Sequence, residues 1–195
     1  VFASVFAVPD VIDVYATENV TSAPVPVGST NYVLAPHSLL VSVVGGDNEE
    51  IADAIWRKKD VGCNMNGNTV VTVVDSEGYL QPYPEYEIRF LRPTALPIVI
   101  EVELAASPSL PVDIVALVKA AVIATFTGAD GGSRVRIGSL LLASKFYPGV
   151  IAIGPEVSVL SILVGDTYPT ETSLLIGVDQ APTIDENDIS VVLTP

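Results

Sequence analysis

The sequence predicts an α+β protein of two small units, each a mixed or antiparallel sheet packed with one or two helices. Three observations lead to this class. Short apolar runs rich in β-branched residues indicate strands, and capped patterns of helical period indicate helices. The length of 195 residues suits one large domain or two small ones. Arg92-Pro93-Thr94 interrupts the pattern near the middle, so we place a central domain at residues 1–92 and a C-terminal domain at residues 93–195.

The clearest local pattern lies between residues 36 and 68. An apolar run at residues 39–44 predicts a strand, and Gly45-Gly46 ends it. Asp47 stands at an N-cap position, and Glu50 three residues later completes a capping box. Apolar residues at 51, 54 and 55 give the following helix one narrow buried face. The pattern therefore predicts a compact β-α-β unit.

The predicted helix ends in a basic run. Arg57, Lys58 and Lys59 suit the negative end of the helix dipole, and Gly62 supplies a left-handed stop. The same charges could meet an acidic partner. Trp56, the only tryptophan, is either a core residue or an interface anchor. These four positions, 56–59, are candidate interface residues.

The remaining elements are predicted from shorter patterns. Residues 18–31 and 75–84 are expected to be loops. Strands are expected at residues 11–16, 69–74, 86–91, 98–104, 157–163, 173–178 and 189–193, and helices at residues 1–8 and 114–126. The apolar amino terminus lacks a basic segment and resembles a helix whose start is cut off, so we expect a fragment with the front of the first unit missing.

One internal echo links the two halves. ASVFAVPDVIDV at residues 3–14 and ASKFYPGVIAI at residues 143–153 share a helix end, a Phe, a Pro and an apolar run. We therefore expect a helix at residues 140–146 capped by Ser139 and stopped by Pro148-Gly149, then a strand at residues 150–153. Either a duplicated α+β unit or chance accounts for the match.

The composition is apolar and acidic. Hydrophobic residues make up 49%, the mean hydropathy is +0.51, and charged residues make up 16%, below the roughly 25% typical of globular proteins. Either interfaces with other chains or a β-rich core account for this excess, and we favour interfaces. The net charge of −14 is spread over both halves and disfavours nucleic acid and anionic membranes as partners. The apolar stretch at 114–126 is too short to span a bilayer.

The residues that could catalyse a reaction or bind a metal do not form a recognisable motif in the sequence. Glu101 and Glu103 share one strand face, which a solvated surface explains. His37 is the only histidine and Cys63 the only cysteine, so a catalytic triad, an internal disulfide and a cysteine metal cluster lack their parts. The acidic turn at residues 185–188 lacks the order of a calcium loop. We predict no enzyme activity, no cofactor and no metal site.

An aromatic loop is the remaining candidate. Tyr79, Tyr83 and Tyr86 alternate with Pro82 and Pro84. Such loops bind sugars or peptides, or act as stiff packing elements, and we favour packing. Tyr79 and Tyr83 also join the candidate interface residues.

Several stretches resemble the baseplate protein J-like family of contractile phage tails. The central run starts at His37-Ser38 and continues through VVGGD (43–47), IADAI (51–55), KK (58–59), GC (62–63) and GN (67–68), and its most specific block is Gly45–Gly67. DVIDVYATENVT (10–21), IRFLRPTALPIVIEVEL (88–104) and FYPGVIAI (146–153) are similar to further stretches of the family. The resemblance covers nearly the whole chain in the same order.

The resemblance implies a structural role. Members are wedge components of the tail baseplate of a phage or prophage, assembled in the bacterial cytoplasm, and they act through contacts with other baseplate and tail proteins in an oligomer. The family's amino-terminal region is absent here, so its contacts cannot be assigned. The alternative is a carbohydrate-binding or hydrolytic surface domain that uses the loop from Tyr79 to Tyr86.

Overall fold

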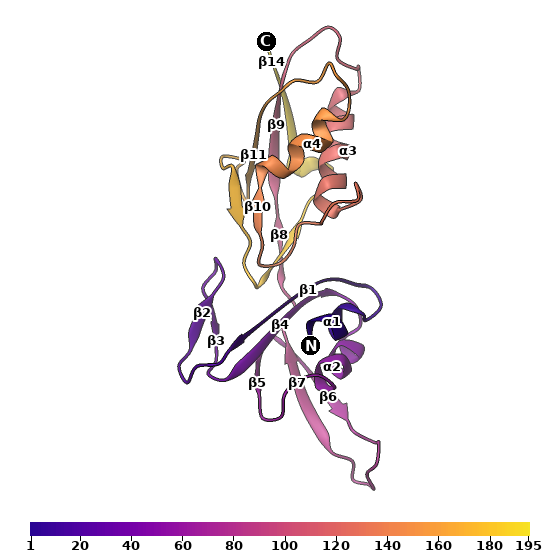
Figure 1. Cartoon of the computed structure of the whole chain (residues 1–195), viewed down its shortest axis with the longest axis vertical. Helices are drawn as coiled ribbons and strands as arrows, with labels where there is room; N and C mark the ends of the chain where they lie inside the picture. The colour runs from indigo at the N-terminus through magenta and orange to yellow at the C-terminus, as the bar shows by residue number, and fades with distance from the viewer. The chain divides into compact units, whose positions relative to one another are not determined.

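The computed structural model describes all 195 residues and confirms the α+β class (Figure 1). The helices are α1 (Phe2–Phe6), α2 (Asn48–Trp56), α3 (Ile114–Thr127) and α4 (Tyr147–Ile151). The strands are β1 (Val11–Asn19), β2 (Val25–Val27), β3 (Tyr32–Leu34), β4 (Ser38–Gly45), β5 (Asn64–Asn66), β6 (Thr69–Val74), β7 (Glu85–Phe90), β8 (Thr94–Pro97), β9 (Val99–Ala105), β10 (Leu140–Leu142), β11 (Val159–Gly165), β12 (Ser173–Leu175), β13 (Gln180–Thr183) and β14 (Ile189–Thr194). None of the helices has the length and hydropathy that crossing a lipid bilayer requires.

The chain divides into two compact units. Unit 1 comprises Val1–Thr94 and Gly177–Ala181, and unit 2 comprises Ala95–Ile176 and Pro182–Pro195. The sequence-based division at 92/93 treats the second half as continuous. No sequence pattern marks the return of residues 177–181 to unit 1.

Burial explains why residues 177–181 belong to unit 1. Val178 is 1% exposed and packs with Leu34, Leu40 and Leu91 in a small separate core. The neighbouring Asp179 side chain accepts a hydrogen bond from the hydroxyl of Thr30 at 2.5 Å. A buried valine and a side-chain hydrogen bond thus hold this short segment among residues far from it in sequence.

Strand β4 is the centre of unit 1. It pairs antiparallel with β1 on one side and parallel with β5 on the other. Strand β5 pairs with the first residues of β4, and Leu91 pairs with later residues of the same edge. Its backbone N–H donates to the carbonyl of Val41 at 2.8 Å, and its carbonyl accepts from the N–H of Val43 at 2.9 Å. Helices α1 and α2 pack on this sheet and on β7, and the main core collects apolar side chains from all of them, namely Val5, Val14, Val41, Val43, Ile51, Ala52, Ala54, Ile55, Ile88 and Phe90.

The turn from β4 into α2 depends on two glycines. Gly45 and Gly46 have φ of +78° and +71°, values that side chains disfavour. A Cβ on Gly45 would also lie 2.2 Å from the carbonyl oxygen of Asp10. Asp47 then caps α2, as predicted, and accepts the N–H groups of residues 49 and 50 at 2.8 and 3.2 Å. The second hydrogen bond of the predicted capping box, from the backbone N–H of Asp47 to the Glu50 side chain, does not form.

Arg92 stabilises this turn from the other end of unit 1. Its guanidinium donates to the carbonyl oxygens of Val43 (3.2 Å), Gly45 (2.5 Å) and Gly46 (2.8 Å), and to the Oδ1 of Asn48 at 2.7 and 3.1 Å. Burial lowers the pKa of this group, and the charge of Asp47 acts in the opposite direction. The fork geometry of arginine satisfies all these acceptors together.

The backbone of Arg92 is held as firmly as its side chain. Asn68 accepts the N–H of Arg92 and donates to its carbonyl, both at 2.9 Å. Gly67, just before Asn68, would place a Cβ 2.1 Å from the carbonyl oxygen of Phe90. The predicted turn at residues 66–68 therefore positions the backbone of Arg92.

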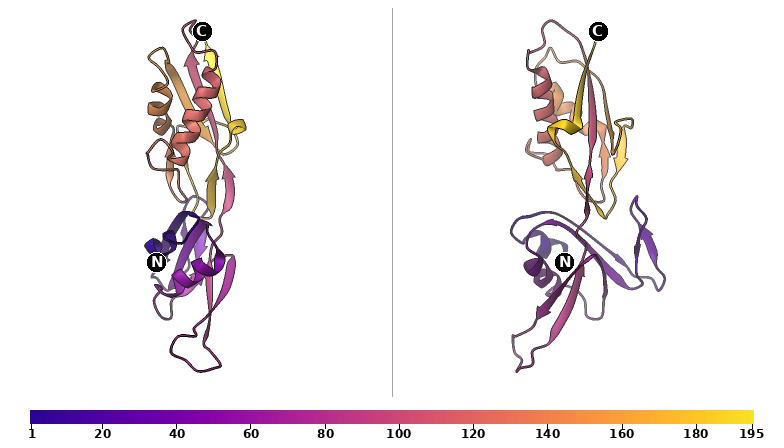
Figure 2. Two further views of the ribbon diagram at one scale, coloured as in Figure 1. Left: turned by 90° about the vertical axis from the view of Figure 1, so that its right-hand side faces the viewer. Right: turned by 180° about the vertical axis from the view of Figure 1, so that it is seen from behind.

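Unit 2 is a three-stranded sheet with helices on one face (Figure 2). The strand order is β11-β9-β14, with β9 antiparallel to β11 and parallel to β14. Along β9, Ile100, Val102 and Leu104 are fully buried against α3, whereas Glu101 and Glu103 lie half-buried on the opposite face. The alternation predicted for this strand is confirmed. Helix α3 ends at Gly128, whose φ is +80°, also as predicted.

The prediction for residues 140–153 is wrong. Residues 140–142 form β10, which pairs with β12. A 3-10 turn follows at Ala143–Phe146, and the strand predicted at residues 150–153 is replaced by the end of α4 and a turn. Pro148 does not stop a helix here because it occupies the first turn of α4, where the missing N–H has no partner to lose. The echo between the two halves therefore does not extend to their structures.

The Gly45 turn gives a stability prediction. Gly45→Ala adds both backbone strain and a steric overlap, whereas Gly62→Ala adds only the strain, since Gly62 has φ +77° and nothing within 4 Å. We expect a loss in the free energy of unfolding of about 1 kcal/mol for Gly62→Ala and about 3 kcal/mol or more for Gly45→Ala. Urea denaturation followed by circular dichroism measures both. Equal losses would contradict the close approach at Gly45.

A second prediction concerns the guanidinium fork. Arg92→Lys keeps the charge but cannot reach all the acceptors, so we expect a loss of about 2 kcal/mol or more in the free energy of unfolding. Arg89→Lys is the matched control, because Arg89 is half-exposed and lies 3.9 Å from Glu87, its one ion-pair partner. Its effect should be close to zero. A neutral result for Arg92→Lys would show that the turn does not depend on these hydrogen bonds.

Candidate functional site

The predicted interface residues lie on two segments of unit 1. Trp56 ends α2, and Arg57, Lys58 and Lys59 follow it directly. The loop of residues 75–84, which joins β6 to β7, carries Tyr79, Leu80 and Tyr83. We call these seven residues and Tyr86 the α2–loop surface. Trp56 contacts Tyr86 at the start of β7, and the charges of Asp75 and Glu77 in the loop act on Arg57.

Trp56 is both a core residue and an exposed one. Its side chain is half-buried and packs against the main core of unit 1. Its ring centroid lies 5.7 Å from that of Tyr86 on β7, with 32° between the planes. The core role is therefore confirmed in part, and the role as an interface anchor stays a prediction. The ring is anchored well enough to present a fixed apolar edge to a partner.

The basic run differs in position from its prediction. Helix α2 ends at Trp56, and Arg57 is the C-cap residue with right-handed backbone, so the three basic residues lie beyond the last turn. Gly62 is left-handed, as predicted, but it follows the helix by several residues and does not stop it. The backbone N–H groups of Lys58 and Lys59 both donate to the carbonyl of Ile55, which tightens the helix end.

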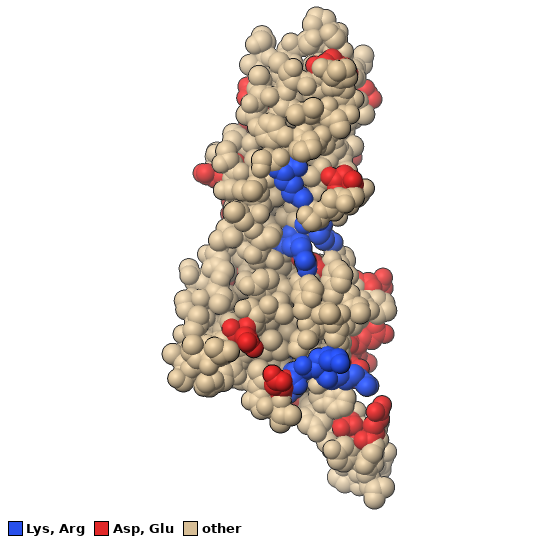
Figure 3. Space-filling view, in the orientation of Figure 1, with Lys and Arg blue, Asp and Glu red and all other residues tan.

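The charges of the basic run are only partly paired. Arg57 donates to Asp53 at 2.7 Å, and this hydrogen bond, followed by the charges of Asp53, Glu77 and Asp75, raises the pKa of the guanidinium. The guanidinium also lies 5.8 Å from the centroid of Trp56. The ammonium groups of Lys58 and Lys59 form no hydrogen bond or ion pair within the chain. Figure 3 shows basic atoms gathered at the level of α2, with acidic atoms on both sides.

The aromatic loop is exposed. Tyr79 is 53% and Leu80 91% exposed, and neither these residues nor Tyr83 belongs to a core cluster. The packing role that we favoured from the sequence is therefore wrong for this loop. An open hollow beside it is lined by Val74, Gln81, Pro82, Tyr83 and Glu85.

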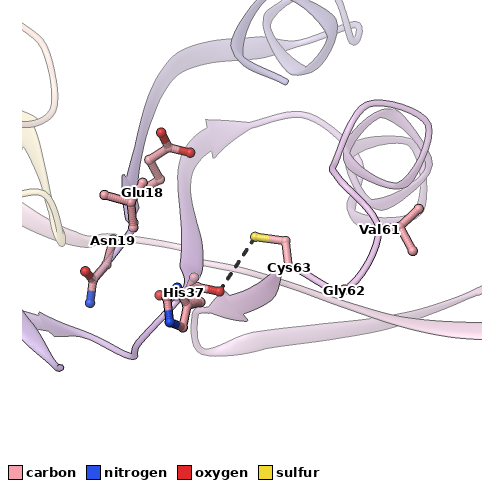
Figure 4. A pocket seen from close by; sticks show the side chains of 8 residues that line it. Glu18, Asn19, His37, Val61, Gly62 and Cys63 are labelled. Carbon is pink, nitrogen blue, oxygen red and sulfur yellow. Dashed lines mark hydrogen bonds between the residues drawn. The ribbon is translucent and has the colours of Figure 1, made fainter. Parts of the chain in front are cut away.

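A second hollow brings together residues that the sequence kept apart. It is lined by Glu18, Asn19, Val20, His37, Ser38 and residues 61–63 (Figure 4). The thiol of Cys63 lies 4.0 Å from the carbonyl oxygen of His37 and 3.2 Å from that of Asn64. The contact is to the backbone of His37 and not to its imidazole. The pair therefore lacks the base-to-nucleophile contact that thiol catalysis needs.

The acidic candidates have structural partners. Glu103 accepts hydrogen bonds from Thr194 at 2.7 Å and Ser161 at 2.9 Å, which lower the pKa of its carboxyl group. Asp185 and Asp188 cap a short 3-10 turn reciprocally. No three His, Cys, Asp or Glu side chains are grouped so that they could hold a metal ion.

Sequence reasoning missed two exposed aliphatic residues. Leu80 lies at the tip of the aromatic loop, and Val61, next to the basic run, is fully exposed. For Val61 the signal was present, because Asp60 and Gly62 flank it as turn residues, whereas Leu80 lies between Tyr79 and Gln81 and carries no such signal. We now include Leu80 among the residues most available to a partner.

Comparisons with known proteins assign no relative. A scan against models of protein families and a search of curated sequences both find no match.

The dual position of Trp56 leads to a prediction. Trp56→Ala removes packing from the core edge, so we expect the free energy of unfolding to fall by about 2 kcal/mol. Lys58 lies two residues after Trp56, and its ammonium group has no hydrogen-bond or ion-pair partner. Lys58→Ala should therefore leave the urea midpoint unchanged. Unfolding followed by circular dichroism serves both variants. An unchanged midpoint for Trp56→Ala would indicate that the ring contributes to partner contacts alone.

Proposed function

We propose that the chain is a structural subunit of a contractile-tail baseplate wedge, from a phage or a prophage, that acts through protein–protein contacts. Its partners are then other baseplate and tail proteins in an oligomer, and it assembles in the bacterial cytoplasm before residing in the virion tail. The observation that carries the proposal is the exposure of the apolar side chains of Tyr79, Leu80 and Tyr83 on the loop that joins β6 to β7.

The character of this surface supports a protein partner. Tyr79, Leu80 and Tyr83 expose apolar atoms on the loop of residues 75–84, and Trp56 packs on Tyr86 in β7, the strand that follows this loop. Aromatic residues combined with arginine are enriched at the centres of protein interfaces. The unpaired ammonium groups of Lys58 and Lys59 give the rim a positive charge in a chain of net charge −14. An acidic rim on the partner would complement them.

The arrangement of the family-like block supports the resemblance in a different way. Gly45 and Gly46, which belong to the most specific block, and Asn68, which directly follows it, all form hydrogen bonds with Arg92. Their side chains and backbone groups are used in holding the turn before α2. The resemblance therefore concerns residues that build the turn before α2.

The first experiment is capture from lytically induced source cells. The tagged full chain serves as bait, and mass spectrometry identifies the bound proteins. We expect tail tube, sheath or wedge proteins, and we expect Tyr79→Ser combined with Leu80→Ser to reduce their recovery at least about tenfold, since exposed aromatic and aliphatic anchors dominate such contacts. Tyr168→Ser is the matched control, because Tyr168 is 74% exposed in unit 2.

Two outcomes would count against the proposal. Failure to recover any tail protein from lysates that contain them would refute it. Equal recovery with the double variant and the wild type would refute the role of the α2–loop surface.

The second candidate is carbohydrate binding at the same loop. The hollow beside Tyr83 contains an aromatic ring together with the polar side chains of Gln81 and Glu85, which is a combination suited to a sugar. A glycan array probed with the full chain would give a saturable signal that Tyr83→Ala abolishes. Such a signal without capture of tail proteins would favour this function.

A further inference from the structure

Strand β14 is an unprotected edge of the sheet in unit 2. It lies outside β9 in the order β11-β9-β14, and its sequence ISVVLT contains no charged residue and no proline. Natural sheets protect such edges with lysine, proline, bulges or a covering segment, because unpaired strand backbone pairs with other chains. β14 has none of the sequence features that prevent pairing.

The register shows which backbone groups are available. The carbonyl of Thr194 accepts the N–H of Ala106 at 2.7 Å, so the backbone groups of Thr194 point toward β9. Directions alternate along a strand. The backbone N–H and C=O groups of Ile189, Val191 and Leu193 therefore point away from β9, and they have no hydrogen-bond partner within the chain.

Apolar side chains border this edge on the face covered by α3. Val191 is half-buried and Leu193 is 45% exposed. Leu193 forms a hollow with the segment before α3, which includes Leu110 and the fully exposed Val112. Val115 on α3 is also exposed. A strand added to β14 would place every second side chain beneath these residues and remove them from water.

The charge at the start of β14 indicates what else the added strand would carry. Asp185, Glu186 and Asp188 precede the strand directly, and their carboxylates face solvent or cap the turn. Lys119 lies four residues after Val115 on α3. It is the one basic side chain that bonds to residues 185–188, and it donates to the carbonyl of Glu186 at 2.6 Å. The net charge at this end is therefore negative.

We propose that β14 accepts an extended segment of a partner protein as a further strand of the sheet. The segment has apolar side chains at alternate positions and a lysine or arginine beside residues 185–188. Backbone hydrogen bonds supply the affinity, the hollow at Leu193 selects the apolar positions, and the acidic turn sets the direction. This inference concerns unit 2 alone and does not rest on the proposed baseplate role.

The test begins with a displayed library of random peptides selected on the full chain. Peptides of about twelve residues are long enough to pair with a strand of this length. We expect the enriched peptides to alternate apolar and polar residues and to carry lysine or arginine at one end. Absence of enrichment, or enrichment of helical or acidic sequences, would overturn the proposal.

Matched substitutions then locate the binding site. Leu193→Lys places a charge at the edge, and Val192→Lys places the same charge at the neighbouring residue, which is 41% exposed on the opposite face of the sheet. We expect peptide affinity, measured by fluorescence anisotropy, to fall at least about tenfold in Leu193→Lys and to change less than about twofold in Val192→Lys. Equal losses would overturn the assignment to the edge.

Amide hydrogen exchange on the unmodified chain gives an independent measurement if a variant does not fold. Bound peptide should slow exchange at Val191 and Leu193 by about tenfold or more and leave Val192 unchanged, because the amide of Val192 already pairs with β9. Protection elsewhere without protection at these two amides would overturn the proposal. So would a dimer, detected by light scattering, that Leu193→Lys dissociates and Val192→Lys does not, because the occupant would then be a second copy.

Discussion

The hydrogen bonds of Arg92 are the constraint on which unit 1 depends. One guanidinium bonds to the carbonyls of Val43, Gly45 and Gly46 and to the side chain of Asn48. These groups come from the end of β4 and the start of α2, and the arginine itself follows β7. The interaction therefore ties the central strand, the helix and the last strand of the unit at one point. Without it, the close turn at Gly45 would leave several carbonyl groups poorly satisfied.

This constraint also determines where the α2–loop surface lies. The turn fixes the direction in which α2 leaves the sheet, and the helix then carries Trp56 to β7, where it meets Tyr86. The exposed loop between β6 and β7 extends from the same pair of strands. A scaffold of small, strained and fully bonded residues thus presents a surface of large apolar ones. The two sets alternate along the sequence, and the fold separates them.

Sequence patterns predicted the parts of this fold that depend on neighbouring residues. The cap at Asp47, the stop at Gly128 and the alternation along β9 are local features, and all three are confirmed. One failure involves a distant partner, and the other a proline at a helix position that tolerates it. Residues 140–142 became a strand because β12 lies beside them, and Pro148 began a helix that it was expected to end. For the α2–loop surface, the aromatic and basic residues were identified from sequence, but the contact of Trp56 with Tyr86 and the exposure of Leu80 require the folded chain.

The return of residues 177–181 to unit 1 has a consequence for how this protein could change over evolutionary time. Val178 lies among Leu34, Leu40 and Leu91, so unit 1 is complete only when a pentapeptide encoded far downstream is present. No single crossover in the gene separates the two units, because a fragment that ends near residue 94 would lack this piece of its own interior. Exchange of either unit alone between related genes would leave a hydrophobic gap in one product. The two units are therefore expected to be inherited as a pair, even though each has its own sheet and core.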